Sequence, residues 1–148
     1  MTGVSLFRVT RRYRFSCSHR LYSAALTDAE NARIYGKCNN PYGHGHDYVL
    51  RVTACGPTNA AGRVVNIAAL DELVEREILD RLDHRNLNAD VDWFRAAPPT
   101  SENLAAAICG RLKGSWRTAF AGEWPRLDGI CIEETPRNIF QVHANEIE

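Results

Sequence analysis

A cysteine and two histidines lie close together in residues 36–46, which read GKCNNPYGHGH. Side chains two positions apart on an extended segment point to the same side, so His44 and His46 can converge on one point. Two converging imidazoles suit a divalent cation, and zinc above all. The stretch therefore predicts a metal site.

His19 is the candidate for a third ligand. The run from Val4 to Phe15 alternates between apolar side chains and arginine or threonine, as a strand with two different faces does. The apolar positions continue through Cys17 to His19, so we expect His19 to point inward. Three histidines would leave one zinc position open, which is typical of a catalytic rather than a structural site.

Cys38 allows two interpretations. As a fourth zinc ligand it would close the coordination shell and make the site structural. As a free thiolate beside the cation it would have a lowered pKa and could act as a base or nucleophile. The spacing of residues 38–46 leaves both interpretations open.

Two carboxylates add candidates for proton transfer and binding. The adjacent pair Asp83 and His84 indicates either a helix-exit capping interaction or a proton relay in which the carboxylate orients the imidazole. Glu134 continues the apolar positions of Ile130 and Ile132. Burial of a carboxylate is costly without a partner, so Glu134 is predicted to bind something. It could accept two hydrogen bonds from the guanidine-like edge of a heterocycle.

Strands and helices must hold these side chains in place. Periodicity predicts strands at Val4–Phe15, after His46 to Cys55, Arg63–Asn66, Leu127–Glu134 and Ile139–His143, a helical turn near Asp28–Ile34, and helices at Ala68–Leu82 and after Pro98-Pro99. Asn66 is the expected cap of the first long helix, and Thr100 or Ser101 that of the second. Glu102 is favoured by the dipole at the start of that helix.

Apart from the short strand at Arg63–Asn66, these elements predict one α+β domain over residues 1–148, with a four-stranded antiparallel sheet and two helices packed on one face. The opposite face also carries apolar side chains, so we expect oligomerisation through the sheet.

Composition excludes several classes of protein. The 18 Lys and Arg balance the 18 Asp and Glu, so no net field attracts nucleic acid or an anionic membrane. No apolar run has the length of a membrane span, and no secretory signal opens the chain. The five cysteines are an odd number without the spacing of a disulfide framework, which favours a reducing, cytoplasmic setting.

Five motifs, in order and spacing, resemble those of the 6-pyruvoyl-tetrahydropterin synthase family: residues 15–21, FSCSHRL; residues 36–46; residues 82–87, LDHRNL; residues 100–103, TSEN; and Glu134-Thr135. They span nearly the whole chain. The resemblance implies the tunnelling fold, in which trimers close a β-barrel, two trimers stack as a homohexamer, and active sites lie between subunits.

The resemblance also implies roles for single residues. It implies zinc ligands at His19, His44 and His46, a proton acceptor at Cys38 assisted by Asp83 and His84, and substrate binding by Glu134, Thr100, Ser101 and Glu102. Two positions depart from the family pattern: Cys17 replaces a small residue, and Tyr42 lies inside the cysteine–histidine loop.

The implied reaction converts 7,8-dihydroneopterin triphosphate to 6-pyruvoyl-tetrahydropterin with release of triphosphate. Five residues separate Cys38 from His44, as in the pyruvoyl branch of the family. An alternative within the family is a 6-carboxy-tetrahydropterin synthase of queuosine synthesis, which releases acetaldehyde from the same substrate. A third interpretation is a non-catalytic, zinc-stabilised oligomer in which Cys38 closes the coordination shell.

Overall fold

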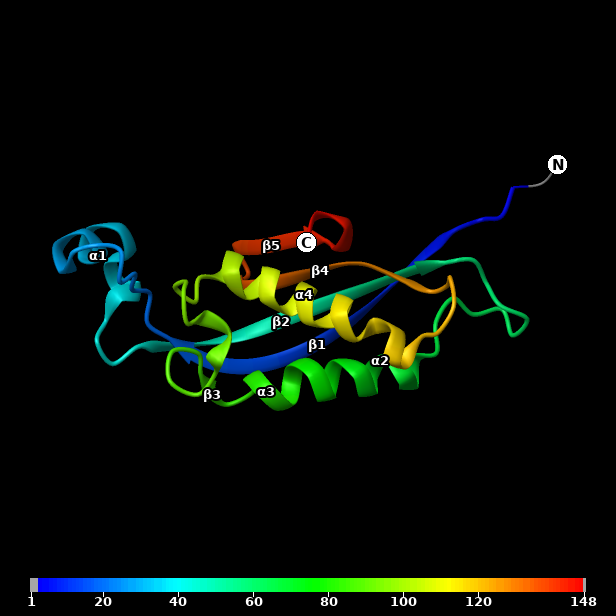
Figure 1. Cartoon of the computed structure of the whole chain (residues 1–148), viewed down its shortest axis with the longest axis horizontal. Coiled ribbons are helices and arrows are strands. Elements are labelled where there is room, and N and C mark those ends of the chain that lie inside the picture. Colours follow the sequence, from blue (N-terminus) through cyan, green and yellow to red (C-terminus); the bar gives the residue numbers. More distant parts are fainter. Residues whose placement is uncertain (1–2, 148) are drawn as a thin grey trace.

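A long hairpin of β1 (Phe7–His19) and β2 (His44–Gly56) forms the middle of the sheet in the computed structural model, which describes residues 3–147 (Figure 1). The antiparallel register pairs Phe7 with Gly56 at one end and His19 with His44 at the other. The first strand begins at Phe7 rather than Val4 and continues to His19, as its alternating pattern predicts. The hairpin therefore brings distant histidines side by side.

The described part of the chain has five strands in the order β3-β1-β2-β4-β5, where the sequence predicts four. The expected hairpin of β4 (Arg126–Thr135) and β5 (Asn138–His143) adds to β2. The unpredicted strand is β3 (Arg85–Asn86), which lies parallel to β1. A strand of two residues is too short to produce a periodic pattern, so in the sequence it cannot be distinguished from the polar loop around it.

Two helical segments cover one face of the sheet, as expected (Figure 1). The first comprises α2 (Ile67–Val74), a π-helical turn η2 (Glu75–Leu79) and α3 (Asp80–Leu82); the second is α4 (Ser101–Ala119). Asn66 caps α2, because its Oδ1 accepts from the backbone N of Ala69 at 3.1 Å. Thr100 caps α4, because its Oγ1 accepts from Asn103 N at 3.2 Å.

The strand predicted at Arg63–Asn66 is wrong, because this segment is irregular and bends at residues 64–65. The side chain of Asn59 explains the difference. Its Oδ1 accepts from the backbone N of Ala61 at 2.9 Å and of Arg63 at 3.0 Å, so the loop closes on itself. A short β-like sequence gains less from an unpaired extended form than from these hydrogen bonds.

The remaining short elements lie in connections. Between β1 and β2 the chain forms α1 (Asp28–Tyr35), which confirms the predicted helical turn, and η1 (Gly36–Asn39); η3 (Asp92–Phe94) precedes α4 and η4 (Ala144–Glu146) follows β5. The α1–η1 segment lies beyond the end of the β1–β2 hairpin, at the left of Figure 1. This is the end at which His19 and His44 pair.

The core lies between the sheet and the two helical segments. Leu50 and Ile132 from the sheet and Leu104, Ile108 and Leu112 from α4 are all completely buried. Full burial of a leucine or isoleucine side chain contributes about 1.5–3 kcal/mol, so this layer holds the strands rigidly under the site. None of the helices in residues 3–147 combines the length and apolar character needed to cross a membrane.

Candidate functional site

His19, His44 and His46 meet at the end of the β1–β2 hairpin. Their candidate ligand atoms all lie within 4.8 Å of one another, and Nε2 of His19 is 3.3 Å from Nε2 of His44. The register explains this convergence, since His19 pairs directly with His44, and His46 follows two positions later on the same face. The predicted triad is confirmed as a geometric cluster.

The backbone before α4 sets the tautomer of His19. Nδ1 of this buried ring is 2.9 Å from the carbonyl oxygen of Pro99, which can only accept. Nδ1 therefore carries the hydrogen, and the lone pair of Nε2 faces the other two rings. Such a hydrogen bond from the outer nitrogen is the usual support of a metal-binding imidazole.

The rings are electrostatically suited to hold a cation. Burial, together with the nearby histidines, lowers the pKa of His19 and of His44, so both are neutral near pH 7. Nδ1 of His44 and Nε2 of His46 are buried and have no hydrogen-bond partner among the described residues. Converging imidazole nitrogens, two of them buried without a hydrogen-bond partner, fit a zinc ion.

Glu134 lies beside the triad, as its apolar neighbours in β4 predict. Its Oε1 is 3.1 Å from Nε2 of His46, which is not aligned for a hydrogen bond, and 4.0 Å from Nε2 of His19. The β4–β5 register shifts between Glu133 and Thr135, and such irregularities re-aim side chains. The carboxyl group is only 15% exposed, so it is directed at the site rather than at solvent.

Cys38 lies in η1, partly buried, and does not belong to the cluster of candidate ligand atoms found among the described residues. Burial, and then the charge of Glu134, raises the pKa of its thiol in the chain without a metal. The arrangement favours a free thiol over a fourth ligand.

Asp83 and His84 are both held against Ser16 of β1. Oδ1 of Asp83 accepts from Ser16 N at 2.9 Å, and His84 N donates to Ser16 O at 2.6 Å. The His84 ring is 3.7 Å from Asp83 Oδ2 and is 84% exposed. Within the described residues, no hydrogen bond or ion pair joins His84 to the triad. His84 does line the same cavity of about 470 Å³ as His46, so one chain brings the two residues to a common cavity without bonding them to each other.

Three of the residues predicted to bind substrate lie at the start of α4. Thr100 is engaged as the cap, and Glu102 is exposed in the first turn, where the helix dipole explains it. Ser101 is 5% exposed, and its hydroxyl has no hydrogen-bond partner in the part of the chain that the structure describes. Tyr48 has a similarly unpaired buried hydroxyl, and Ser101 is close enough to affect its pKa, which burial raises. The sequence does not signal that the hydroxyl of Tyr48 is buried without a partner.

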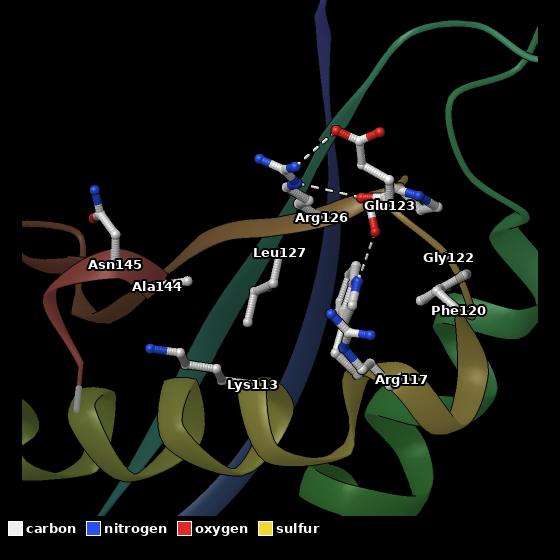
Figure 2. Close-up of a pocket in the computed structure, with 11 residues that line it drawn as sticks. Lys113, Arg117, Phe120, Gly122, Glu123, Arg126, Leu127, Ala144 and Asn145 are labelled. Atoms are coloured by element: carbon white, nitrogen blue, oxygen red, sulfur yellow. Dashed lines mark hydrogen bonds and ion pairs between the residues drawn. The ribbon is translucent and has the colours of Figure 1, made fainter.

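The most voluminous of the described cavities, about 700 Å³, lies at the other half of α4 (Figure 2). It is lined by Lys113, Arg117, Glu123, Arg126 and neighbouring apolar residues, and by none of the predicted site residues. Lys113 Nζ donates to Ile147 O at 2.5 Å, and Arg126 pairs with Glu123 at 3.0 Å. Because two positively charged side chains of this cavity already have partners, the histidine cluster is the stronger candidate site.

Comparison with known proteins agrees with this geometry. A sequence profile described as 6-pyruvoyl tetrahydropterin synthase matches residues 8–145. The 6-pyruvoyl tetrahydrobiopterin synthase of Drosophila melanogaster is 44% identical over 132 residues, which cover 88% of this chain and 76% of that protein. The protein of the same name from Homo sapiens is 48% identical over 107 residues, covering 72% of this chain and 74% of that one.

Solved structures show the same likeness. The structure of Caenorhabditis elegans 6-pyruvoyl tetrahydropterin synthase has a TM-score of 0.85 and 38% identity, and covers 97% of this chain and 99% of that one. At 15% identity, the Plasmodium vivax 6-pyruvoyl tetrahydropterin synthase has a TM-score of 0.64, covers 94% of this chain and 98% of that one, and supports the fold alone. The chain belongs to the 6-pyruvoyl tetrahydropterin synthase family.

Proposed function

We propose that this chain is a zinc-dependent lyase that converts 7,8-dihydroneopterin triphosphate to 6-pyruvoyl-tetrahydropterin and triphosphate. The observation that carries the proposal is the convergence of three imidazoles, with the Nδ1 hydrogen of His19 directed to Pro99 O. This arrangement leaves the inner nitrogens free for a cation. The names of its relatives, which are 6-pyruvoyl synthases, support the pyruvoyl product.

Glu134 is proposed to anchor the pterin ring. Its carboxylate can accept two hydrogen bonds from the N–H groups of a guanidine-like ring edge, and its low exposure strengthens such charge-assisted bonds. When the pterin ring is fixed at Glu134, the side chain of the pterin is directed toward the histidines, which lie beside Glu134. This positioning reduces the entropy lost in the reaction.

Cys38 is proposed to remove the proton from the substrate side chain. Zinc, when bound, supplies a positive charge that stabilises negative charge on the side-chain oxygens and lowers the pKa of the Cys38 thiol. Asp83 and His84 then return a proton or deprotonate a hydroxyl. Hydrogen moves within the substrate, so no nicotinamide is needed, and triphosphate departs as a stable anion.

The exposed position of His84 fits an oligomeric enzyme. We propose a homohexamer of two stacked trimers, in which the Asp83–His84 pair completes the site of a neighbouring subunit. The first half of β1 supports this assembly, since Phe7 is 49% exposed and belongs to an edge that a second sheet could cover. All five cysteines are unpaired within the chain, which supports a reducing, cytoplasmic setting.

Product analysis tests the proposal. The zinc-loaded protein is incubated with 7,8-dihydroneopterin triphosphate, and the products are identified by mass. We expect the pyruvoyl pterin and triphosphate, with turnover that falls when a chelator removes zinc. A carboxy pterin with acetaldehyde would assign the chain to the 6-carboxy branch, and no turnover with any zinc content would refute a catalytic role.

A further inference from the structure

The dipeptide Arg20-Leu21, which directly follows His19, is hydrogen-bonded to the loop that carries Cys38. Leu21 N donates to Cys38 O at 2.7 Å, and Nε of Arg20 donates to Asn39 O at 3.0 Å. The side chain of Asn39 adds a third hydrogen bond, from Nδ2 to Leu21 O at 3.0 Å. The backbone that leaves a metal-ligand position therefore holds the proposed base.

The same dipeptide is held from another side by Asn88. Oδ1 of Asn88 accepts from Arg20 N at 2.7 Å, and Nδ2 donates to Arg20 O at 2.9 Å. This amide therefore satisfies both backbone groups of one residue, as a neighbouring strand would. Asn88 belongs to the loop that follows Asp83 and His84, so this loop is attached to the same point of the chain.

We propose that Asn39 and Asn88 are positioning residues that fix the Cys38 loop and the Asp83–His84 loop relative to the histidine cluster through Arg20-Leu21. This inference rests on the proposed function for the meaning of those loops. Neither amide needs to touch substrate. Each replaces regular sheet pairing at a place where three irregular segments meet, and such segments otherwise move the most.

The two amides should differ in strength. Asn39 is partly buried, so its loss leaves the carbonyl of Leu21 short of a partner where water is scarce. Asn88 is exposed, and water can replace its two hydrogen bonds at a smaller cost. We therefore expect a larger effect at Asn39.

The test compares Asn39→Ala, Asn88→Ala and the matched control Asn59→Ala in the zinc-loaded protein. Asn59 also holds a loop by hydrogen bonds to two backbone N–H groups. This loop follows the end of β2, where Gly56 pairs with Phe7, at the opposite end of the hairpin from His19 and His44. Small displacements of reacting groups can cost about 100-fold in rate, so we expect kcat to fall about 10- to 100-fold for Asn39→Ala and about 3- to 10-fold for Asn88→Ala. KM and zinc content should match the control, and any decrease in unfolding temperature should leave the protein folded at the assay temperature.

Asn39→Asp separates hydrogen bonding from shape. Aspartate has nearly the same size but places an acceptor where Nδ2 donates to Leu21 O. We expect it to be at least as impaired as Asn39→Ala. Full activity of Asn39→Asp would overturn the positioning role of this hydrogen bond.

A second measurement does not depend on turnover. Hydrogen exchange of the Leu21 N–H, which donates to Cys38 O, should accelerate in Asn39→Ala and stay unchanged in Asn59→Ala. If exchange accelerates in Asn39→Ala but the wild type has no turnover, the proposed function is refuted, while the structural role of Asn39 in holding the Cys38 loop is retained. Unchanged exchange, unchanged kcat, or a kcat loss that follows zinc or stability would each overturn the positioning role.

Discussion

Nδ1 of His19 donates to the carbonyl oxygen of Pro99, 80 residues further along the chain, at 2.9 Å. This contact joins the end of β1 to the turn that starts α4. It determines which nitrogen of His19 faces His44 and His46. A backbone carbonyl thus prepares the cluster for a cation, and it does so before any metal binds.

Replacing His44 or His46 with alanine should lower zinc content and activity together. Each ring supplies one of the three converging nitrogens. Loss of a residue that only supports a metal ligand typically lowers metal affinity about 10- to 100-fold, so loss of a ligand itself should lower it further. Zinc titration by a competing chelator measures the change. His143→Ala, on exposed β5, is the control and should bind zinc like the wild type. Full zinc affinity in both site variants would refute the ligand assignment.

Cys38→Ala should retain zinc and lose turnover by about 10²- to 10⁴-fold, the range typical of an acid–base residue. The thiol lies outside the ligand cluster, so metal analysis should give the wild-type stoichiometry. Cys131→Ala removes another partly buried free thiol and should leave both quantities unchanged. Loss of zinc in Cys38→Ala would instead support the closed, structural site.

Glu134→Gln should weaken pterin binding while the fold and the zinc content persist. Hydrogen bonds to a charged group contribute about 1.5–3 kcal/mol, so we expect an increase in Kd of about 10- to 100-fold. Calorimetry with neopterin measures this without turnover. Glu133→Gln, whose side chain occupies the alternate position of β4, serves as the control. Equal affinity of the two variants would remove Glu134 from the pterin site.

Asp71 on α2 should make stability depend on pH below neutrality. Its carboxylate accepts from Arg11 Nη2 at 2.9 Å and from Tyr13 OH at 2.7 Å, and these contacts, the Arg11 hydrogen bond first, lower the pKa of Asp71. A lowered folded-state pKa means that the stabilisation is present above the unfolded value of about 3.9 and is lost as pH falls through the folded value.

Urea unfolding of the wild type and Asp71→Asn at several pH values tests this. Because the pair is substantially exposed, we expect a difference of less than about 1 kcal/mol at pH 7. The difference should shrink as the pH falls below about 4, the unfolded value of an aspartate. A difference that stays constant over this range would show that Asp71 acts through packing rather than charge.

The sequence by itself determined the features that arise from local pattern. Alternation in β1 placed His19 on the inward face, the spacing of His44 and His46 placed their rings together, and an acidic residue in an apolar row identified Glu134. Asn66 and Thr100 were recognisable caps, because capping depends on residues only three positions away. The long helices followed from their apolar periodicity.

The tertiary structure decided what depends on contacts between distant segments. No residue type signals that the carbonyl of Pro99 receives a hydrogen bond from His19, since every residue has a carbonyl. The two-residue strand β3, the exposed ring of His84 and the two amides at Arg20-Leu21 likewise depend on how loops meet. The wrong prediction of a strand at Arg63–Asn66 also arises from a contact that periodicity does not reveal. The side chain of Asn59 accepts hydrogen bonds from the backbone of this loop, which therefore does not pair with the sheet.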